Sequence, residues 1–400
     1  MAINQIESKW VKASVLAGLW AGIEIVAGSF LHNLKIPLSG TFLTLISIVL
    51  VIGIFQIWKQ PGIIWRAGII TALMKSISPS AVILGPMIAI AMEGFILEFS
   101  IRMIGKNILG YFIAGAFTMV GALMHKIIHL FVLYGWDIFK IYEEMFRFAV
   151  LKMGLPDARP VYVVTALFFI YAMLGLLAAL AGWFIGNRAL KEQSSELPAL
   201  NECTTGKKWE STDSYINYSP VLLILHVILI PLLLFSFSKL SPDLALLVAL
   251  PYLLFVAWRY KIAVRRMKKW LFWIQLLVIL ALAWFFGSTS SEGLHGKMEA
   301  LSQGFSMVLR ALVVVMGFSG LSTELRAPVM QRLFFKTGFK QLYLSINNAF
   351  SILPAIVDDM DTPRQFIRNP VRSVALSLQY VNSWHRHLIL KTLENKTKVS

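Results

Sequence analysis

Residues 38–57 read LSGTFLTLISIVLVIGIFQI, a run of twenty residues that contains no charged side chain. As an α-helix this run would be about 30 Å long, which matches the hydrocarbon core of a bilayer. Similar apolar runs recur along the 400-residue chain, and they predict an all-α, polytopic membrane protein with about ten transmembrane helices. The predicted spans are residues 13–33, 38–57, 61–78, 80–104, 107–134, 160–187, 218–237, 242–258, 270–287 and 298–321.

The composition excludes a soluble enzyme and a disordered chain. Hydrophobic residues make up 57% of the chain and charged residues 14%, whereas soluble domains have about 45–50% and about 25%. The net charge of +16 is typical of cytoplasmic loops rich in Lys and Arg, so we expect membrane lipid around the chain and no nucleic-acid partner. The single cysteine, Cys203, excludes an intramolecular disulfide and a Cys-rich metal site.

Basic residues predict the orientation and divide the chain. Clusters at 9–12, 188–208, 259–269 and 326–340 all fall on one side of the predicted spans, which the positive-inside rule assigns to the cytoplasm. Both termini are therefore predicted to be cytoplasmic, in a bacterial-type cytoplasmic (inner) membrane. The predicted parts are a six-helix domain at 1–189, a polar linker at 190–216, a four-helix domain at 217–321, and cytoplasmic helices with a tail at 322–400.

Two further segments have the pattern of amphipathic helices. Segment 135–159 lies on the predicted outer side and carries four basic and four acidic residues, so we expect an interfacial helix there. In segment 339–360, apolar residues such as Leu342, Ala349 and Leu353 recur at helical spacing. We expect this cytoplasmic helix either to lie on anionic lipid or to dock a soluble partner.

Acidic residues within the predicted spans are the first candidates for a functional site. Glu24 lies in the first span, and Glu93 and Glu98 lie in the fourth. A carboxylate in hydrocarbon needs a partner or a polar cavity. We take Glu24 and Glu93 as candidate solute contacts, and pairing with Arg66 or Lys75 is the structural alternative.

Two pairs of polar residues at the predicted outer end are further candidate solute contacts. His125 and His129 share one face of a helix because they are four residues apart. They lack the acidic residue of the zinc-protease motif HExxH, so we predict no metal site, and interfacial packing is the alternative. His32 and Asn33 precede Pro37 in a short loop that forms either a lid or a plain hairpin.

The sequence lacks the glycine-rich loops that bind phosphate in nucleotide-binding proteins. The chain therefore cannot hydrolyse ATP through a P-loop of its own, and if it pumps, a partner supplies the energy. The spans contain no Ser/His/Asp constellation with supporting context. We therefore predict that the chain is not an enzyme and holds no cofactor of its own.

Six predicted spans in residues 1–190 include the stretches IEIVAGSFLHNLKIPLSGT (23–41) and GIITALMKSISPSAVILGPMIAIAMEGFILE (68–98). In these features the N-terminal half resembles the substrate-binding S component of energy-coupling factor (ECF) transporters. Such components are six-helix membrane proteins that capture vitamins or related micronutrients. The resemblance implies that the N-terminal half binds a small solute.

The C-terminal half contains FSMVLRALVVVMGFSGLSTELRAPVMQRLF (305–334) and LSINNAFSILPAIVDDM (344–360), which are similar to the transmembrane coupling T component of ECF transporters. This resemblance implies that cytoplasmic helices of the chain engage separate, soluble P-loop ATPase subunits, which hydrolyse the ATP. The Ala-Arg-Gly motif expected after Asp359 is missing, because MDTPRQFIRNPVRSV (360–374) stands there. The candidate coupling residues are Arg326, Asp358, Asp359, Arg364 and Arg368.

Together the two resemblances imply the membrane subunit of an ATP-driven micronutrient importer, with a solute-binding half fused to a coupling half. One alternative is a membrane enzyme acting on lipid or isoprenoid substrates, because Asp358 and Asp359 could hold Mg²⁺ with a diphosphate. The other alternative is a membrane scaffold that does not transport.

Overall fold

The structure is a computed structural model, and all the regular structure in its described residues is helical. Within the described part of the chain, four helices are long and apolar enough to cross a membrane: Ser39–Trp58, Ile108–Tyr134, Pro160–Lys191 and Leu301–Leu321. The prediction of an all-α membrane protein is confirmed to this extent, and the count of ten spans stays a prediction. The described residues are 8–33, 38–75, 84–153, 159–192, 219–237, 240, 242–260, 270–286, 294–325, 340–359, 378, 380–386, 388 and 389.

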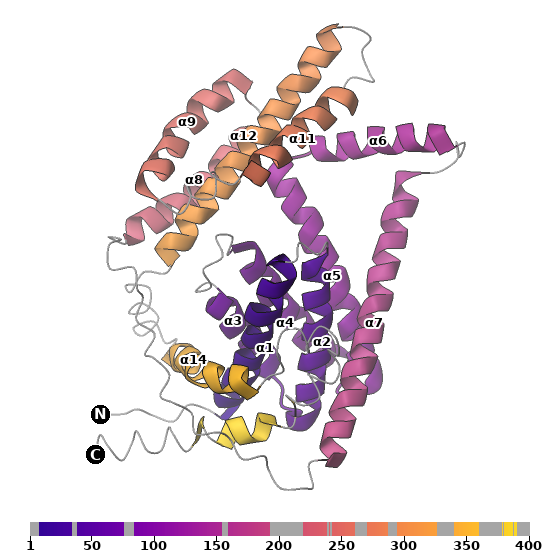
Figure 1. Cartoon of the computed structure of the whole chain (residues 1–400), viewed down its shortest axis with the longest axis vertical. Coiled ribbons are helices and arrows are strands. Elements are labelled where there is room, and N and C mark those ends of the chain that lie inside the picture. The colour runs from indigo at the N-terminus through magenta and orange to yellow at the C-terminus, as the bar shows by residue number, and fades with distance from the viewer. Residues whose placement is uncertain are drawn as a thin grey trace.

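Six helices from the N-terminal half pack together as bundle one (Figure 1). Its members are α1 (Ser8–Asn33), α2 (Ser39–Trp58), α3 (Ile63–Lys75), α4 (Leu84–Ile104), α5 (Ile108–Tyr134) and α7 (Pro160–Glu192). The helix α6 (Asp137–Met153) runs from the end of α5 toward the beginning of α7. It lies within the segment where an amphipathic helix was predicted. Bundle one thus takes its helices from residues 8–192, with α6 at one end, and the predicted division into domains stays a prediction.

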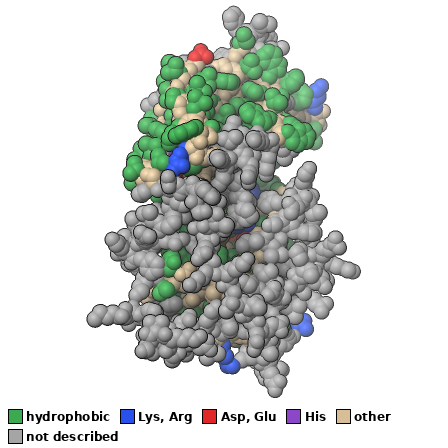
Figure 2. Space-filling model, turned by 60° about the vertical axis from the view of Figure 1, so that its left-hand side comes forward, with side chains coloured by type: hydrophobic (Ala, Val, Ile, Leu, Met, Phe, Trp, Pro, Cys, Tyr) green, Lys and Arg blue, Asp and Glu red, His purple; other side chains and the backbone are tan. Residues whose placement is uncertain are grey.

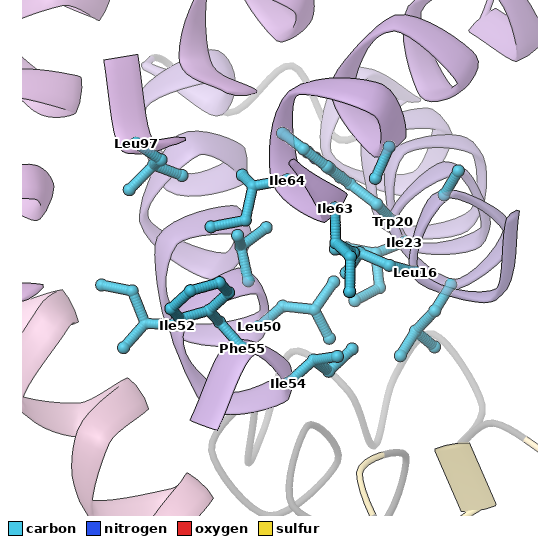
Figure 3. Close-up of a cluster of buried hydrophobic side chains, with 14 of the residues drawn as sticks. Leu16, Trp20, Ile23, Leu50, Ile52, Ile54, Phe55, Ile63, Ile64 and Leu97 are labelled. Atoms are coloured by element: carbon cyan, nitrogen blue, oxygen red, sulfur yellow. The ribbon is translucent and has the colours of Figure 1, made fainter. Parts of the chain in front are cut away.

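The core of bundle one is formed by large aliphatic and aromatic side chains from several helices. Figure 3 shows Trp20 and Leu16 of α1 close to Leu50 of α2 and Ile64 of α3. All four side chains are fully buried. Burying such side chains stabilises a fold by roughly 1.5–3 kcal/mol each in water. Between lipid tails that gain is small, so close helix packing carries more of the stability.

The described part of helix α3 is shorter than a bilayer crossing. It has 13 residues and is therefore about 20 Å long, whereas the hydrocarbon core is about 30 Å thick. The predicted span at 61–78 is helical only from Ile63 to Lys75 among its described residues. Within bundle one, α3 packs closely on α4, where Gly68 and Gly94 lie backbone to backbone.

Four helices from the C-terminal half form bundle two (Figure 1). Its members are α8 (Pro220–Ser236), α9 (Pro242–Arg259), α11 (Trp270–Phe286) and α12 (Leu294–Leu325). The long helix α12 contacts each of the other three. Figure 2 shows hydrophobic side chains spread over the upper part of the molecule, where α9 lies, and Leu247 and Trp258 of α9 are largely exposed. Such an apolar outer surface suits contact with lipid tails.

The two bundles meet where α5 and α6 reach α11 and α12. Ile141 of α6 packs in one apolar cluster with Ile279 of α11 and Met307 of α12. Beside this cluster the guanidinium group of Arg310 fills the space next to Gly135, whose φ of +72° favours glycine. A side chain at Gly135 would overlap that guanidinium group, so this junction depends on a glycine.

Helix α14 (Lys340–Asp359) packs on bundle one rather than on bundle two. Ala349, Ile352 and Ile356 are buried, and they face Gly18 in the middle of α1. The apolar face of α14 is therefore covered by the chain itself. This corrects the expectation that this face lies on lipid or docks a soluble partner.

The last described segment, 378–389, also joins bundle one. Leu378 packs against Gly53 of α2, and Trp58 Nε1 donates a 3.2 Å hydrogen bond to Asn382 Oδ1. The ring of His385 lies 5.6 Å from that of Trp58. Burial and, to a smaller extent, the nearby Lys12 ammonium group lower the pKa of His385 below its usual value. His385 is thus expected to be neutral at pH 7 within this apolar contact.

Helices α5 and α7 approach each other through Gly115 and Gly175. A Cβ atom at Gly175 would overlap the carbonyl oxygen of Gly115. We expect Gly175→Leu to force the two helices apart and to lower the free energy of unfolding by about 2–3 kcal/mol, measured by thermal denaturation in detergent. The control is Gly40→Ala, because a Cβ there meets nothing within 4 Å. Equal melting temperatures for both variants would contradict this packing.

Candidate functional site

Polar side chains from all six helices of bundle one gather toward one of its ends. Lys75 ends α3, and Thr41 and Thr44 lie in the first two turns of α2. The others lie about two to three turns from the corresponding ends of α1, α4, α5 and α7. Under the predicted orientation these ends all face outward. We call this group the polar cluster; its members are Glu24, Thr41, Thr44, Lys75, Glu93, Lys126 and Tyr171.

Glu24 and Lys75 form a buried ion pair between α1 and α3. Lys75 Nζ lies 3.5 Å from Glu24 Oε2 and donates a 2.8 Å hydrogen bond to the Glu24 carbonyl oxygen. Glu24 is only 6% exposed. Lys75 is the last residue of α3, so it also places a positive charge where the helix dipole is negative. This pairing is the structural alternative predicted from the sequence, with Lys75 rather than Arg66 as the partner.

Glu93 is the least satisfied charged group of the polar cluster. It is 5% exposed, and its Oε1 atom lies 2.8 Å from the hydroxyl of Thr44 on α2. Within the described part of the chain, its Oε2 atom has no hydrogen-bond partner. A buried polar atom without a partner is costly, and such atoms are enriched at functional sites. Glu93 is therefore the residue of this cluster best placed to bind something that the chain does not supply.

Lys126 of α5 binds two hydroxyl groups instead of a carboxylate. Its Nζ atom donates to Thr41 Oγ1 at 2.5 Å and to Tyr171 Oη at 3.2 Å, and it lies 5.4 Å from the centre of the Tyr171 ring. Thr41 and Tyr171 are themselves in contact at 3.2 Å. Lys126 thus joins α2, α5 and α7.

Glu98 has a structural role at the opposite end of α4. Its two carboxylate oxygens accept hydrogen bonds from the backbone N–H groups of Gly62 and Ile64, at 2.6 and 3.0 Å. Arg102 donates to the same carboxylate at 2.8 Å. Glu98 therefore caps the start of α3 from another helix, and both of its oxygens are satisfied.

The histidine pair lies beside Lys126 on α5. The rings of His125 and His129 are parallel within 8°, with 6.4 Å between their centres. The hydrogen bonds and the ion pair described above for Glu24, Glu93 and Lys75 involve neither histidine ring. Among the described residues, no group of three or more His, Cys, Asp or Glu side chains could hold a metal ion. Contact of this pair with a solute stays a prediction.

The remaining predicted site residues fall partly or wholly outside the described residues. His32 and Asn33 form the end of α1, next to the polar cluster in the chain, and their side chains lie outside the description. The same holds for the side chains of Asp358 and Asp359 at the end of α14. Arg326, Arg364 and Arg368 lie entirely outside the described residues.

Sequence reasoning missed a second buried network, which lies in bundle two. His226 of α8 is fully buried, and its ring nitrogens lie 2.9 Å from Tyr252 Oη and 3.0 Å from Tyr260 Oη. Tyr260 donates at 2.8 Å to Glu324, whose other oxygen accepts the N–H of Ser219 at 2.9 Å. This network links α8, α9 and α12. The signal that could have revealed it is the histidine within an apolar span, which the sequence analysis did not use.

Sequence reasoning also missed Thr41, Thr44, Lys126 and Tyr171. Lys126 is a charged residue in an apolar span, the same signal that identified Glu24 and Glu93. The two threonines and the tyrosine carry no such signal, because these residue types are common in transmembrane helices.

No protein-family model matches the chain, and neither a curated protein nor a solved structure shows significant similarity to it.

The Glu24–Lys75 pair can be tested by a double-mutant cycle. We expect Lys75→Met to lower the free energy of unfolding by about 3 kcal/mol, because it leaves the Glu24 carboxylate buried without a cation. Adding Glu24→Gln should restore most of the loss, since it removes that charge. The readout is thermal denaturation in detergent.

The matched control for this cycle is Lys140→Met, because Lys140 forms an exposed pair with Asp137 on α6. Loss of that pair should change the stability by at most about 1 kcal/mol. A Lys75→Met variant that is no less stable than the Lys140→Met variant would show that the buried pair is dispensable.

Proposed function

We propose that the chain is the membrane subunit of an ATP-driven importer of the energy-coupling factor type, and that bundle one binds a vitamin or a related small solute. The observation that carries this proposal is the polar cluster, in which Glu93 is buried and has one carboxylate oxygen without a partner among the described residues. The residue resemblances to S and T components point in the same direction.

The polar cluster is costly for a purely structural element. It brings two carboxyl groups and two ammonium groups into the interior of a helix bundle that lies in lipid. Apolar side chains of similar volume would pack there without any desolvation cost. Polar groups that face a bundle interior are typical of substrate and ion pathways. The solute is proposed to bind among Glu24, Glu93 and Lys126, with His32, Asn33, His125 and His129 as further contacts.

Coupling to an ATPase requires contacts between the two halves of the chain. Two such contacts support the proposal: α14 packs on α1, and α5 and α6 pack on α11 and α12. A movement of bundle one would therefore displace the C-terminal half at two contacts, through α14 and through α11 and α12. Because the apolar face of α14 is already buried, the ATPase is proposed to engage Arg326, Asp358, Asp359, Arg364 and Arg368 through polar contacts.

Neither alternative is favoured by a contact among the described residues, and the side chains of Asp358 and Asp359 lie outside them. An enzyme acting on isoprenoid diphosphates would need further Mg²⁺ ligands near Asp358 and Asp359. A scaffold would not need the buried charges of the polar cluster. The experiment that separates them is purification of the chain from its membrane: a P-loop ATPase that co-purifies with it would favour the importer over both alternatives.

The solute can be sought by native mass spectrometry of the full chain purified from its natural host. We expect a small molecule to remain bound to the wild-type protein and to be lost in Glu93→Gln, because the amide replaces one carboxyl oxygen with an NH2 group and can never become negatively charged. The control is Glu143→Gln, which changes an exposed carboxylate of α6. Retention of the molecule in Glu93→Gln would remove Glu93 from the binding site.

The proposed orientation places residues 190–216 in the cytosol, and the single Cys203 reports on it directly. We expect a membrane-impermeant maleimide to label Cys203 in inverted membrane vesicles and not in intact spheroplasts. The control variant combines Cys203→Ser with Met153→Cys at the exposed end of α6, which should show the reverse pattern. Labelling of Cys203 from the outer face alone would invert the orientation and remove the proposed ATPase contact.

A further inference from the structure

The contacts of Glu93 and Thr44 indicate which of the two side chains donates. Thr44 Oγ1 lies 2.8 Å from Glu93 Oε1 and 3.0 Å from the carbonyl oxygen of Gly40. A hydroxyl group has one proton to donate, and a helical threonine commonly donates it to the carbonyl oxygen four residues earlier. If Thr44 donates to Gly40, its oxygen can only accept from Glu93. Glu93 must then carry a proton on Oε1.

The other oxygen of Glu93 supports the same assignment. An ionised carboxylate that is 95% buried and has one oxygen without a partner would carry a large desolvation cost. In a protonated carboxyl group, the negative charge is gone and Oε2 is a neutral carbonyl oxygen, for which a missing partner costs much less. Glu98, in contrast, has both oxygens satisfied by backbone N–H groups and by Arg102, as an ionised carboxylate requires.

The charged groups around Glu93 provide a second arrangement for the ionised form. On α1 and α3 the Glu24 carboxylate and the Lys75 ammonium group neutralise each other. On α5 the Lys126 ammonium group is held by the hydroxyls of Thr41 and Tyr171, from α2 and α7, and no carboxylate lies within its described contacts. Thr41, which holds Lys126, and Thr44, which contacts Glu93, lie three residues apart on α2, so Lys126 is a cation within reach of a Glu93 carboxylate once the proton has left.

From this geometry we infer that Glu93 is a proton-binding site, and that Lys126 exchanges its two hydroxyl partners for the Glu93 carboxylate when the proton is released. In that step the O–H bond of Glu93 breaks, the proton passes to solvent, and the carboxylate gains the Lys126 ammonium group as its ion pair. The described arrangement is then the proton-loaded one. This inference holds whether or not bundle one carries a solute.

Infrared difference spectroscopy tests the protonation directly. The full chain in dodecyl maltoside, a detergent without carbonyl groups, is compared between about pH 6 and about pH 9, where ordinary Asp and Glu side chains stay ionised. We expect a deuterium-sensitive band of a protonated carboxyl group at the lower pH. This band should disappear in Glu93→Gln and persist in Glu98→Gln, with the helical circular dichroism of Glu93→Gln unchanged. A band that persists in Glu93→Gln, or a wild-type protein without the band, would overturn the inference.

Two further variants keep the test decisive if either glutamate variant folds poorly. Thr44→Val removes the acceptor of the proposed hydrogen bond, so the band should remain and move to higher frequency. Lys126→Met removes the cation that stabilises the carboxylate, so the band should persist to a more alkaline pH than in the wild-type protein. An unchanged frequency in Thr44→Val would show that Glu93 does not donate to Thr44, and an unchanged titration in Lys126→Met would rule out the exchange.

Discussion

The constraint that governs this molecule is that lipid tails cannot solvate a charged or polar side chain. Each polar group inside the bundles must therefore find its partner within the chain. Glu98 does so by accepting two backbone N–H groups and Arg102. Glu24 does so through Lys75 on a neighbouring helix. Against these satisfied groups, the partnerless oxygen of Glu93 stands out as an exception that needs a physical reason.

Close helix contact makes these pairings possible. Gly68 of α3 and Gly94 of α4 lie backbone to backbone, one residue from Glu93 along α4. Gly115 and Gly175 bring α5 and α7 together in the same way, and Lys126 reaches Tyr171 farther along these two helices. Small residues at helix interfaces are common in membranes, because packing rather than hydrophobic burial holds the helices together. In bundle one, the same approach also brings polar groups of different helices within bonding distance.

The sequence allowed the helices and the buried carboxylates to be predicted well, because both signals are local. A charged residue in an apolar run is visible without knowing its neighbours, and Glu24 and Glu93 were found in this way. Which cation each carboxylate meets depends on how the helices are rotated and stacked, and no single-residue signal contains that information. For this reason Lys75 was one of two candidate partners, and the hydroxyls of Thr44 and Tyr171 were missed.

The position of α14 could not be predicted for a related physical reason. Its apolar stripe is visible in the sequence, but a stripe shows only that the helix covers something apolar. Lipid, a partner protein and another part of the chain all satisfy that requirement. Gly18 on α1 offers a flat surface on which Ile352 and Ile356 fit, and this complementarity becomes evident only in three dimensions.

The two buried polar networks differ in a way that bears on their roles. In bundle two, His226 has a tyrosine on each ring nitrogen, and both oxygens of Glu324 accept hydrogen bonds, so the network is closed. A closed network holds its helices in one arrangement, because any shift would leave a buried group without its partner. In bundle one, Glu93 leaves one oxygen open and Lys126 is held by neutral hydroxyls. An open acceptor and a cation held by neutral groups leave room for the second arrangement inferred above, and a moving or binding element requires two such arrangements.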